Sequence, residues 1–127
     1  MGRKITVAVD FDGTLVKHKY PKIGKIIQPA FDCLKELQRL EIVSLILWTC
    51  REDCELRDAV EFCEKQGLKF DKINENVNEY MGSFAKRKIV VGYYIDDGNI
   101  DWNRDWDEIE RWKWIFIKLR SKYMEIN

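Results

Sequence analysis

Asp10 and Asp12 stand one residue apart, directly after an apolar run. The stretch ITVAV at residues 5–9 is short and β-branched, as expected of a strand buried on both faces of a parallel sheet. Ionised carboxylates at the end of such a strand are costly unless something compensates their charge. The sequence DFDGTL at residues 10–15 therefore indicates a chemical site, although an Asp-Gly pair alone is an ordinary turn signal.

Polar residues also follow two other apolar runs. Thr49 comes directly after IVSLILW at residues 42–48, and Asp96 and Asp97 come directly after IVVGYYI at residues 89–95. Taken singly, each is a common way for a strand to end. Because ligands of parallel α/β sheets bind where the carboxyl ends of the strands meet, we expect four carboxylates and a hydroxyl to converge at one edge.

This set of side chains favours phosphate chemistry with a metal ion. Crowded carboxylates raise one another's pKa unless a cation lies among them, and oxygen-only ligation points to a hard cation such as Mg²⁺. Asp10 can then attack phosphorus to form an aspartyl phosphate. Asp12 can protonate the departing alkoxide and later accept a proton from the attacking water. Thr14, Thr49 and a nearby Lys can stabilise the phosphoryl oxygens.

The elements that must position these residues alternate between strand and helix. The order predicts an α/β fold, a three-layer α/β/α, Rossmann-like, doubly wound parallel sheet, in a single domain over residues 1–127. The spacing of apolar residues predicts helices at residues 29–40, 53–67 and 106–123. Pro29 suits the first turn of the first helix, and Asp53 and Gly67 are expected to cap and to end the second. A weaker strand is expected at residues 69–73 and a short helix near residues 80–86.

Composition sets limits on the class of protein. A chain of 127 residues with 46% hydrophobic residues is long enough for one domain with a core. Lys plus Arg and Asp plus Glu both number 22, so charge does not indicate a nucleic acid partner, although a local basic patch is compatible with one. No apolar run is long enough to span a bilayer and no signal peptide is recognisable, so we expect a cytoplasmic protein without a membrane partner.

The cysteines do not form a recognisable metal motif. Cys33, Cys50, Cys54 and Cys63 include no CxxC pair, and His18 is the only histidine. A zinc site is therefore not expected, and the cysteines are interpreted as reduced thiols.

Three stretches together resemble motifs of the haloacid-dehalogenase-like (HAD) phosphohydrolases. The sequences DFDGTL at residues 10–15, LILWT at 45–49 and YYIDD at 93–97 are similar to the first, second and fourth motifs of that superfamily, in the same order. The similarity extends from Ile5 to about Asn99. The stretches at residues 18–24, 48–51 and 87–97 further resemble a subgroup of small, mostly uncharacterised members.

The resemblance implies a role for each matching residue. Asp10 corresponds to the nucleophile, and Asp12 to the acid/base that also offers its backbone carbonyl to Mg²⁺. Thr49 corresponds to the hydroxyl that binds the phosphate. Asp97 corresponds to the direct metal ligand and Asp96 to its supporting partner. Members of the subgroup often carry Arg where this chain has Gly98, so a substrate contact made by that Arg has no counterpart in the fourth motif here.

The lysine of the third motif has three candidates. Lys88 matches best by resemblance. It precedes a strand of about seven residues, which at about 3.3 Å per residue places it some 20 Å from the end of the strand. Lys86 and Lys72 are the alternatives.

The sequence leaves no room for a cap domain over the site. Only 14 residues separate Thr14 from Pro29, and the 46 between Thr49 and Asp96 are needed for a helix, a strand and their connections. An open site suits a large phosphorylated substrate, or a second copy of the chain that covers it. The residues expected to contact substrate are Gly13, Thr14, His18, Tyr20 and Arg51, although the last three also suit a solvated surface.

Several interpretations of function are compatible with this pattern. The first is a Mg²⁺-dependent phosphomonoesterase, with a nucleotide or polynucleotide-end phosphatase as a narrower version. The second is a non-catalytic phosphate-binding or scaffold protein, which the intact pair Asp10 and Asp12 argues against. A phosphorylation-switched receiver domain is the third, but its phosphoacceptor is expected in mid-chain. Trp102, Trp106, Trp112 and Trp114 suggest either a nucleobase platform or, as their spacing favours, core packing or a protein contact.

Overall fold

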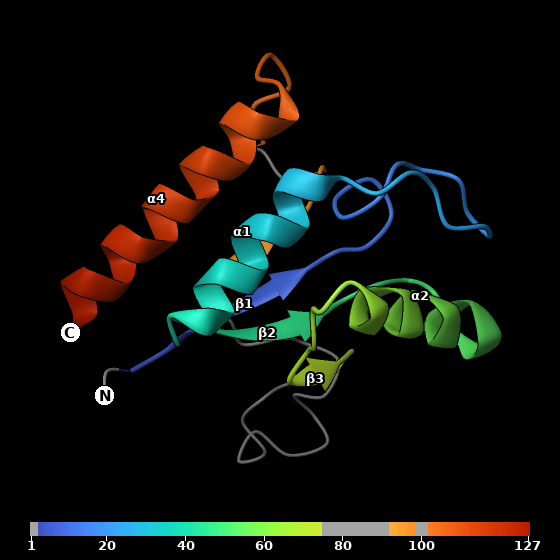
Figure 1. Cartoon of the computed structure of the whole chain (residues 1–127), viewed down its shortest axis with the longest axis horizontal. Coiled ribbons are helices and arrows are strands. Elements are labelled where there is room, and N and C mark those ends of the chain that lie inside the picture. The colour runs from blue at the N-terminus through green and yellow to red at the C-terminus, as the bar shows by residue number, and fades with distance from the viewer. Residues whose placement is uncertain (1–2, 75–91, 99–101) are drawn as a thin grey trace.

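A parallel sheet organises the chain. The computed structural model describes residues 3–74, 92–98 and 102–127. Its strands are β1 (Ile5–Val9), β2 (Val43–Leu47), β3 (Lys72–Ile73) and β4 (Tyr93–Ile95), and all pairings among them are parallel. The spatial order is β3-β2-β1-β4, so the first strand of the chain lies inside the sheet (Figure 1). The α/β fold with a parallel sheet is thus confirmed, as a single domain.

The strand order reverses direction beside β1. From β1 the chain moves to β2 and then to β3 on one side, and it returns to place β4 on the other side of β1. Val9 pairs with Leu47 and with Ile95, so the carboxyl ends of these three strands lie at the same level. Open α/β sheets bind their ligands at such a reversal of the strand order.

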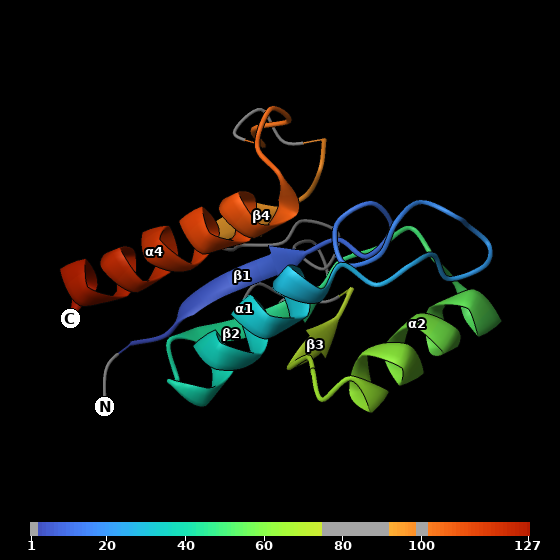
Figure 2. The ribbon, with the colours of Figure 1, turned by 45° about the horizontal axis from the view of Figure 1, so that its top comes forward.

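Helices follow β1, β2 and β4, close to the predicted ranges. They are α1 (Gln28–Arg39), α2 (Asp53–Lys65) and α4 (Glu108–Ile126). In the views of Figures 1 and 2, α1 and α4 lie side by side over the sheet, and α2 lies beside β3. Pro29 stands in the first turn of α1, as predicted. The predicted helix near residues 80–86 and residues 89–91 of the predicted strand fall outside the described residues.

One face of the sheet carries most of the described core. Val7, Val9, Leu45 and Leu47 alternate along β1 and β2 toward this face. They join one buried cluster with residues of all three described helices, among them Phe31, Leu34, Leu37, Ala59, Cys63, Trp112 and Leu119. On the opposite face Ala8 and Ile46 are also buried and pack with Trp48.

Two helix starts differ from the sequence prediction. Asp53 does not cap α2, because it is the first residue of the helix, has a left-handed backbone (φ 51°), and follows Glu52 in the cap position. Trp106 precedes α4, whose cap is Asp107; the Asp107 side chain accepts the N–H of Glu110 at 2.8 Å. Ile109, expected on the buried stripe, is 64% exposed because the stripe begins at Trp112.

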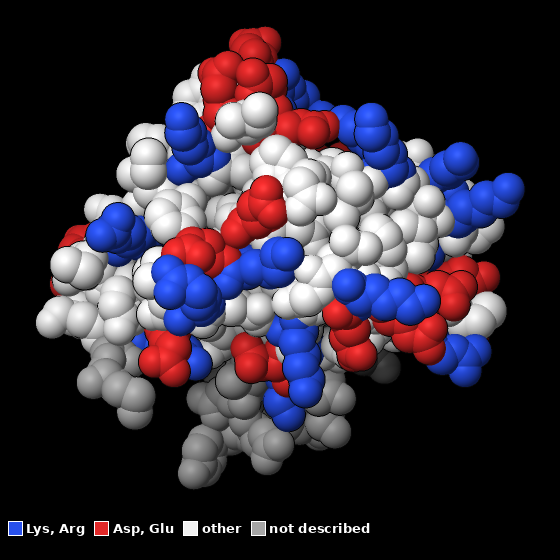
Figure 3. Space-filling model, viewed as in Figure 1, with Lys and Arg blue, Asp and Glu red and all other residues white. Residues whose placement is uncertain are grey.

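The four cysteines are free thiols. Cys33 and Cys63 are buried, and their removal from water raises the pKa of each thiol to about 12. Cys50 and Cys54 are exposed. Among the described residues, no helix is both long and apolar enough to cross a membrane. Acidic and basic side chains are interspersed on the face shown in Figure 3.

Candidate active site

Three carboxylates meet at the strand reversal. Asp10 follows β1, and Asp96 and Asp97 follow the adjacent β4. The backbone N–H of Asp10 donates to the carbonyl of Ile95 at 3.0 Å, which ties the two strand ends together. One oxygen from each carboxylate lies within 4.8 Å of the others. The predicted convergence therefore occurs for these three residues.

Among the described residues, each of the three carboxylates makes its hydrogen bond through one oxygen. Asp10 Oδ1 accepts the N–H of Phe11 at 2.8 Å, and Asp96 Oδ1 accepts the N–H of Gly98 at 2.6 Å. Asp97 Oδ2 contacts the ring nitrogen Nε2 of His18 at 2.9 Å. Within the described chain, the second oxygen of each carboxylate has no hydrogen-bond partner. The local contacts therefore orient the groups while one oxygen of each stays open to a ligand.

The electrostatics of the cluster favour a cation. The pKa of Asp10 is raised to about 6, mainly because burial disfavours its charged form, and further by the charges of Asp96, Asp97 and Asp12. The hydrogen bond from Phe11 opposes this rise. A hard cation among the three groups would offset the repulsion, and an oxygen-only donor set is the kind that Mg²⁺ prefers. The three carboxylates could therefore hold a metal ion.

Asp12 points to a different partner from the other three carboxylates. Its Oδ2 accepts Nε of Arg51 and its Oδ1 accepts Nη2 of Arg51, both at 2.7 Å. Such a two-point pair is among the stronger ion pairs in proteins. The Asp12 side chain does not belong to the acidic cluster. The two aspartates of DFDGTL therefore have separate environments.

Arg51 is buried and fully engaged within the chain, which differs from the substrate contact that the sequence suggested. It is 1% exposed, and besides Asp12 it donates to the carbonyls of Pro21, Lys22 and Glu55. These contacts account for all five N–H groups of the guanidinium. The group also lies 5.0 Å from the ring centre of Phe11 and 5.1 Å from that of Tyr20. Arg51 therefore has no N–H left to bind a substrate.

Gly13 gives the loop after β1 its tight turn. Its φ is +86°, a left-handed conformation that favours glycine. A Cβ at this position would lie 2.1 Å from Nε2 of His18 and 2.5 Å from Oδ2 of Asp97. The backbone of Gly13 thus lies directly against the contact between these two residues.

The other described residues of the predicted site lie in the loops after β1 and β2 or on β3. Thr49 Oγ1 accepts the N–H of Arg51 at 3.2 Å, so it lies in the loop after β2. Thr14 is fully buried, and its hydroxyl has no hydrogen-bond partner within the described chain. Tyr20 is 59% exposed, with its ring beneath Arg51. Lys72 lies on β3, two strands away from β1. Lys86 and Lys88 fall outside the described residues.

Two supporting residues escaped the sequence analysis. Asn74 follows β3 in a left-handed conformation (φ 51°), and its Oδ1 accepts the N–H of Thr49 at 2.8 Å. Asn directly after a short strand is a signal for this conformation. Arg104 donates to the carbonyl of Asp97 across six intervening residues, a contact that no local pattern indicates.

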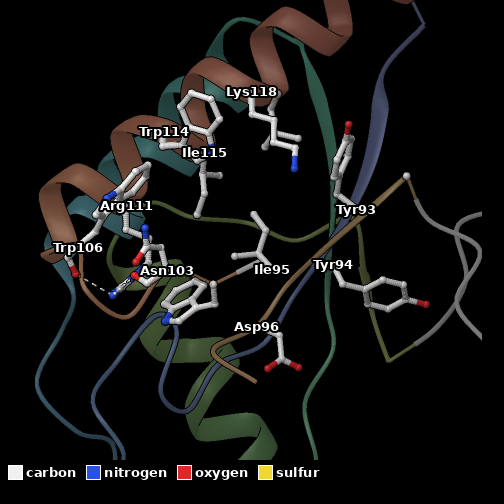
Figure 4. Close-up of a pocket in the computed structure, with 13 residues that line it drawn as sticks. Tyr93, Tyr94, Ile95, Asp96, Asn103, Trp106, Arg111, Trp114, Ile115 and Lys118 are labelled. Atoms are coloured by element: carbon white, nitrogen blue, oxygen red, sulfur yellow. Dashed lines mark hydrogen bonds between the residues drawn. The ribbon is translucent and has the colours of Figure 1, made fainter. Parts of the chain in front are cut away.

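A pocket lies beside the cluster. It has a volume of about 570 Å³ and is formed between β4 and α4, as Figure 4 shows. Tyr93, Trp106 and Trp114 are among its lining residues, and Asp96 lies at its rim. Asp96 is thus the one member of the acidic cluster that also borders the pocket.

Comparison with known proteins identifies a relative but not an activity. No family model matches the chain, and no curated protein sequence matches it. A solved structure, described as that of the conserved protein coded by a locus from Bacteroides thetaiotaomicron, is similar with a TM-score of 0.79 and 38% sequence identity. The match covers 94% of this chain and 93% of that chain. The chain therefore belongs to the same family as this conserved Bacteroides protein.

Proposed function

We propose that the chain is a Mg²⁺-dependent phosphomonoesterase of the HAD type that acts through an aspartyl phosphate. The observation that carries the proposal is the convergence of Asp10, Asp96 and Asp97 at the strand reversal, where one carboxylate oxygen of each lies within 4.8 Å of the others. The order of the three motifs that resemble the HAD superfamily supports it. Asp10, Asp96 and Asp97 are the residues that would hold the ion.

Asp10 is the proposed nucleophile. A bound Mg²⁺ would supply positive charge that draws the phosphate and the carboxylates together. With Oδ1 held by Phe11, the other oxygen of Asp10 is free to attack phosphorus. The bond from phosphorus to the ester oxygen breaks as the bond to Asp10 forms. The ester oxygen then leaves as an alcohol once it has gained a proton.

Asp12 is the proposed acid and base. It gives its proton to the departing oxygen, and it then accepts a proton from the water that attacks the aspartyl phosphate. A water oxygen ends on phosphate and Asp10 is regenerated. Arg51 occupies one lone pair on each oxygen of Asp12, so a second lone pair on each oxygen stays available for the proton. We assign Arg51 to positioning Asp12.

The experiment is hydrolysis of p-nitrophenyl phosphate with Mg²⁺ or EDTA, in wild type, Asp10→Asn and Asp12→Asn. Wild type should require Mg²⁺, with Ca²⁺ a poor substitute because it prefers more ligands at longer distances. Asp10→Asn should lose both turnover and trapping by BeF₃⁻, since the nucleophile is gone. Asp12→Asn should keep BeF₃⁻ binding and lose about 10² to 10⁴ in rate.

Two results would contradict the proposal. Full activity in EDTA would exclude the metal, and near wild-type rates in both variants would exclude the mechanism. A phosphate-binding protein without turnover is the alternative. It predicts that BeF₃⁻ fails to bind while phosphate still does, and that no ester in a broad panel is hydrolysed. Substrates with nucleotide or polynucleotide ends belong in that panel as the narrower version of the function.

A further inference from the structure

The pocket between β4 and α4 lies at the edge of the described sheet. Residues 92–96 line it consecutively, so both faces of β4 contribute, as expected where a strand has no neighbour. Within the described sheet, β4 pairs only with β1. A volume of about 570 Å³ falls within the usual range for small-molecule sites. The pocket is therefore of a size to hold an organic molecule.

Aromatic rings form one wall of the pocket, and they contact one another and Arg111. Trp106 and Trp114 meet edge to face, with ring centres 6.1 Å apart at 85°. The Arg111 guanidinium lies 4.4 Å from the ring centre of Trp102 and donates to the carbonyls of Asn103 and Trp106. Trp114 is nevertheless 51% exposed. A large aromatic ring that packs against a second ring and is still half exposed is suited to stacking on a flat ligand.

A cation faces the same space. Figure 4 shows the Lys118 side chain reaching from α4 toward Tyr93, and its Nζ lies 5.4 Å from the centre of that ring. In the described part of the chain, no carboxylate lies within ion-pair distance of Lys118. The charged lining residues are Arg111, Lys118 and, at the rim, Asp96, so the pocket carries an excess of positive charge. This excess complements an anionic group.

We propose that this pocket binds a planar aromatic group that carries an anionic oxygen. The ring would stack against Trp114 and the oxygen would meet Lys118. We further assign the ring to the leaving group of the phosphate ester, because Asp96 borders both the pocket and the acidic cluster. This second part rests on the proposed function, and the reaction is the same hydrolysis, with the aromatic group released as an alcohol.

Binding is tested first, without metal and without turnover. The probe is 2-naphthoate, followed by saturation-transfer NMR on the full chain, with cyclohexanecarboxylate as a non-aromatic anion and 2-naphthalenemethanol as an uncharged ring. We expect 2-naphthoate to bind more tightly than either. Trp114→Ala should weaken it about tenfold and Lys118→Met about fivefold.

Ile117→Ala is the matched control for these variants. Ile117 lies on the same helix, is 54% exposed and does not line the pocket, so this change should leave binding unaltered. Equal binding of the aromatic and the non-aromatic anion would overturn the proposal. So would Trp114 and Lys118 variants that bind 2-naphthoate as wild type does.

Turnover then tests the assignment to the leaving group. We compare 2-naphthylmethyl phosphate with cyclohexylmethyl phosphate, since both release primary alcohols of similar acidity. kcat/KM should be about tenfold higher for the aromatic ester, and Trp114→Ala should remove this preference with little effect on the other ester. If both esters react equally while 2-naphthoate binds, the leaving-group assignment is wrong. If neither reacts, the proposed function fails, and the binding experiment still decides on the pocket.

Discussion

At the scale of single residues, the site separates two carboxylates that are neighbours in sequence. Asp10 lies among other acids, where burial and repulsion raise its pKa to about 6. Asp12, two positions later, has both oxygens on one buried guanidinium. Two carboxyl groups with such different surroundings are suited to different roles in one reaction. The sequence motif suggested the two roles, but the partner that holds Asp12 is visible only in the structure.

The role of Arg51 as a positioning residue leads to a kinetic prediction. Arg51→Lys keeps the charge but cannot bind both oxygens of Asp12. We expect kcat to fall by about tenfold with little change in KM, because the effect acts through Asp12. In the Asp12→Asn background, the same change should have almost no further effect on kcat. The measurement is a double-mutant cycle of steady-state rates.

Arg39→Ala serves as the control for that cycle. Arg39 pairs with Glu36 on the exposed side of α1, far in sequence from the site, and should leave kcat unchanged. Removing one partner of a buried ion pair can cost about 3 to 5 kcal/mol, so thermal unfolding must confirm that each variant is folded. Additive losses in the double mutant would show that Arg51 does not act through Asp12.

The raised pKa of Asp10 makes the stability of the metal-free protein depend on pH. Between about pH 4 and pH 6 the folded chain retains a proton on Asp10 that the unfolded chain has released. The contribution of Asp10 to stability is therefore present at low pH and is lost as pH rises through about 6. Urea unfolding in EDTA should show wild type losing stability relative to Asp10→Asn over this range. A constant difference between the two proteins would contradict the shift.

At the scale of elements, the loop after β1 is held by contacts with distant segments. Its His18 meets Asp97 after β4, and its Pro21 and Lys22 carbonyls accept from Arg51 after β2. Lys17 forms an ion pair with Glu108 at the start of α4. The loop therefore takes its shape from three other elements. Local sequence patterns predicted where it begins and ends, but not these contacts.

Gly13 offers a test of how tightly this loop fits the site. Gly13→Ala should lower the free energy of unfolding by about 1 kcal/mol through the left-handed backbone alone. The total loss of stability should be larger, because the new Cβ would clash with His18 and Asp97. Chemical denaturation measures the loss of stability, and hydrolysis of p-nitrophenyl phosphate measures the effect on the site.

Gly67→Ala separates backbone strain from the clash. Gly67 has nearly the same φ, +85°, but its nearest neighbour to a new Cβ is 3.5 Å away at Lys35. The two variants should differ in stability by the cost of the clash, and Gly67→Ala should retain full activity. Equal losses in both variants would mean that the fit around Gly13 is loose.

At the scale of the whole molecule, the sequence was sufficient for the parallel sheet and for the edge on which the acids converge. Alternating strands and helices predicted this, because a helix between two strands returns the chain to the edge where it started, so the strands run parallel and their carboxyl ends meet at one edge. The helix boundaries were less predictable. Trp106 and Ile109 continue the apolar period of α4, but Trp106 precedes the helix and Ile109 is exposed, whereas Trp112 and Leu119 are buried.

The site also contains features that no sequence period encodes. The sequence suggested that Arg51 contacts substrate or lies on a solvated surface, whereas its side chain is buried against five acceptors from the loop after β1 and from α2. The pocket lies between α4 and β4, the last strand of the described sheet. Such features depend on how distant segments meet, so they follow from the assembled fold and not from local spacing.

The crowding of Asp10, Asp96 and Asp97 implies a trade-off between folding and function. Groups that repel one another in the folded chain separate when it unfolds, so the site destabilises the protein that contains it. Asp96→Asn keeps the acceptor for Gly98 and removes one charge. In EDTA it should therefore raise the melting temperature, whereas with Mg²⁺ it should lose most of the stabilisation that the ion gives wild type. Calorimetry under the two conditions should show opposite ranking of the two proteins, as expected if the acidic site was retained for its chemistry at the expense of stability.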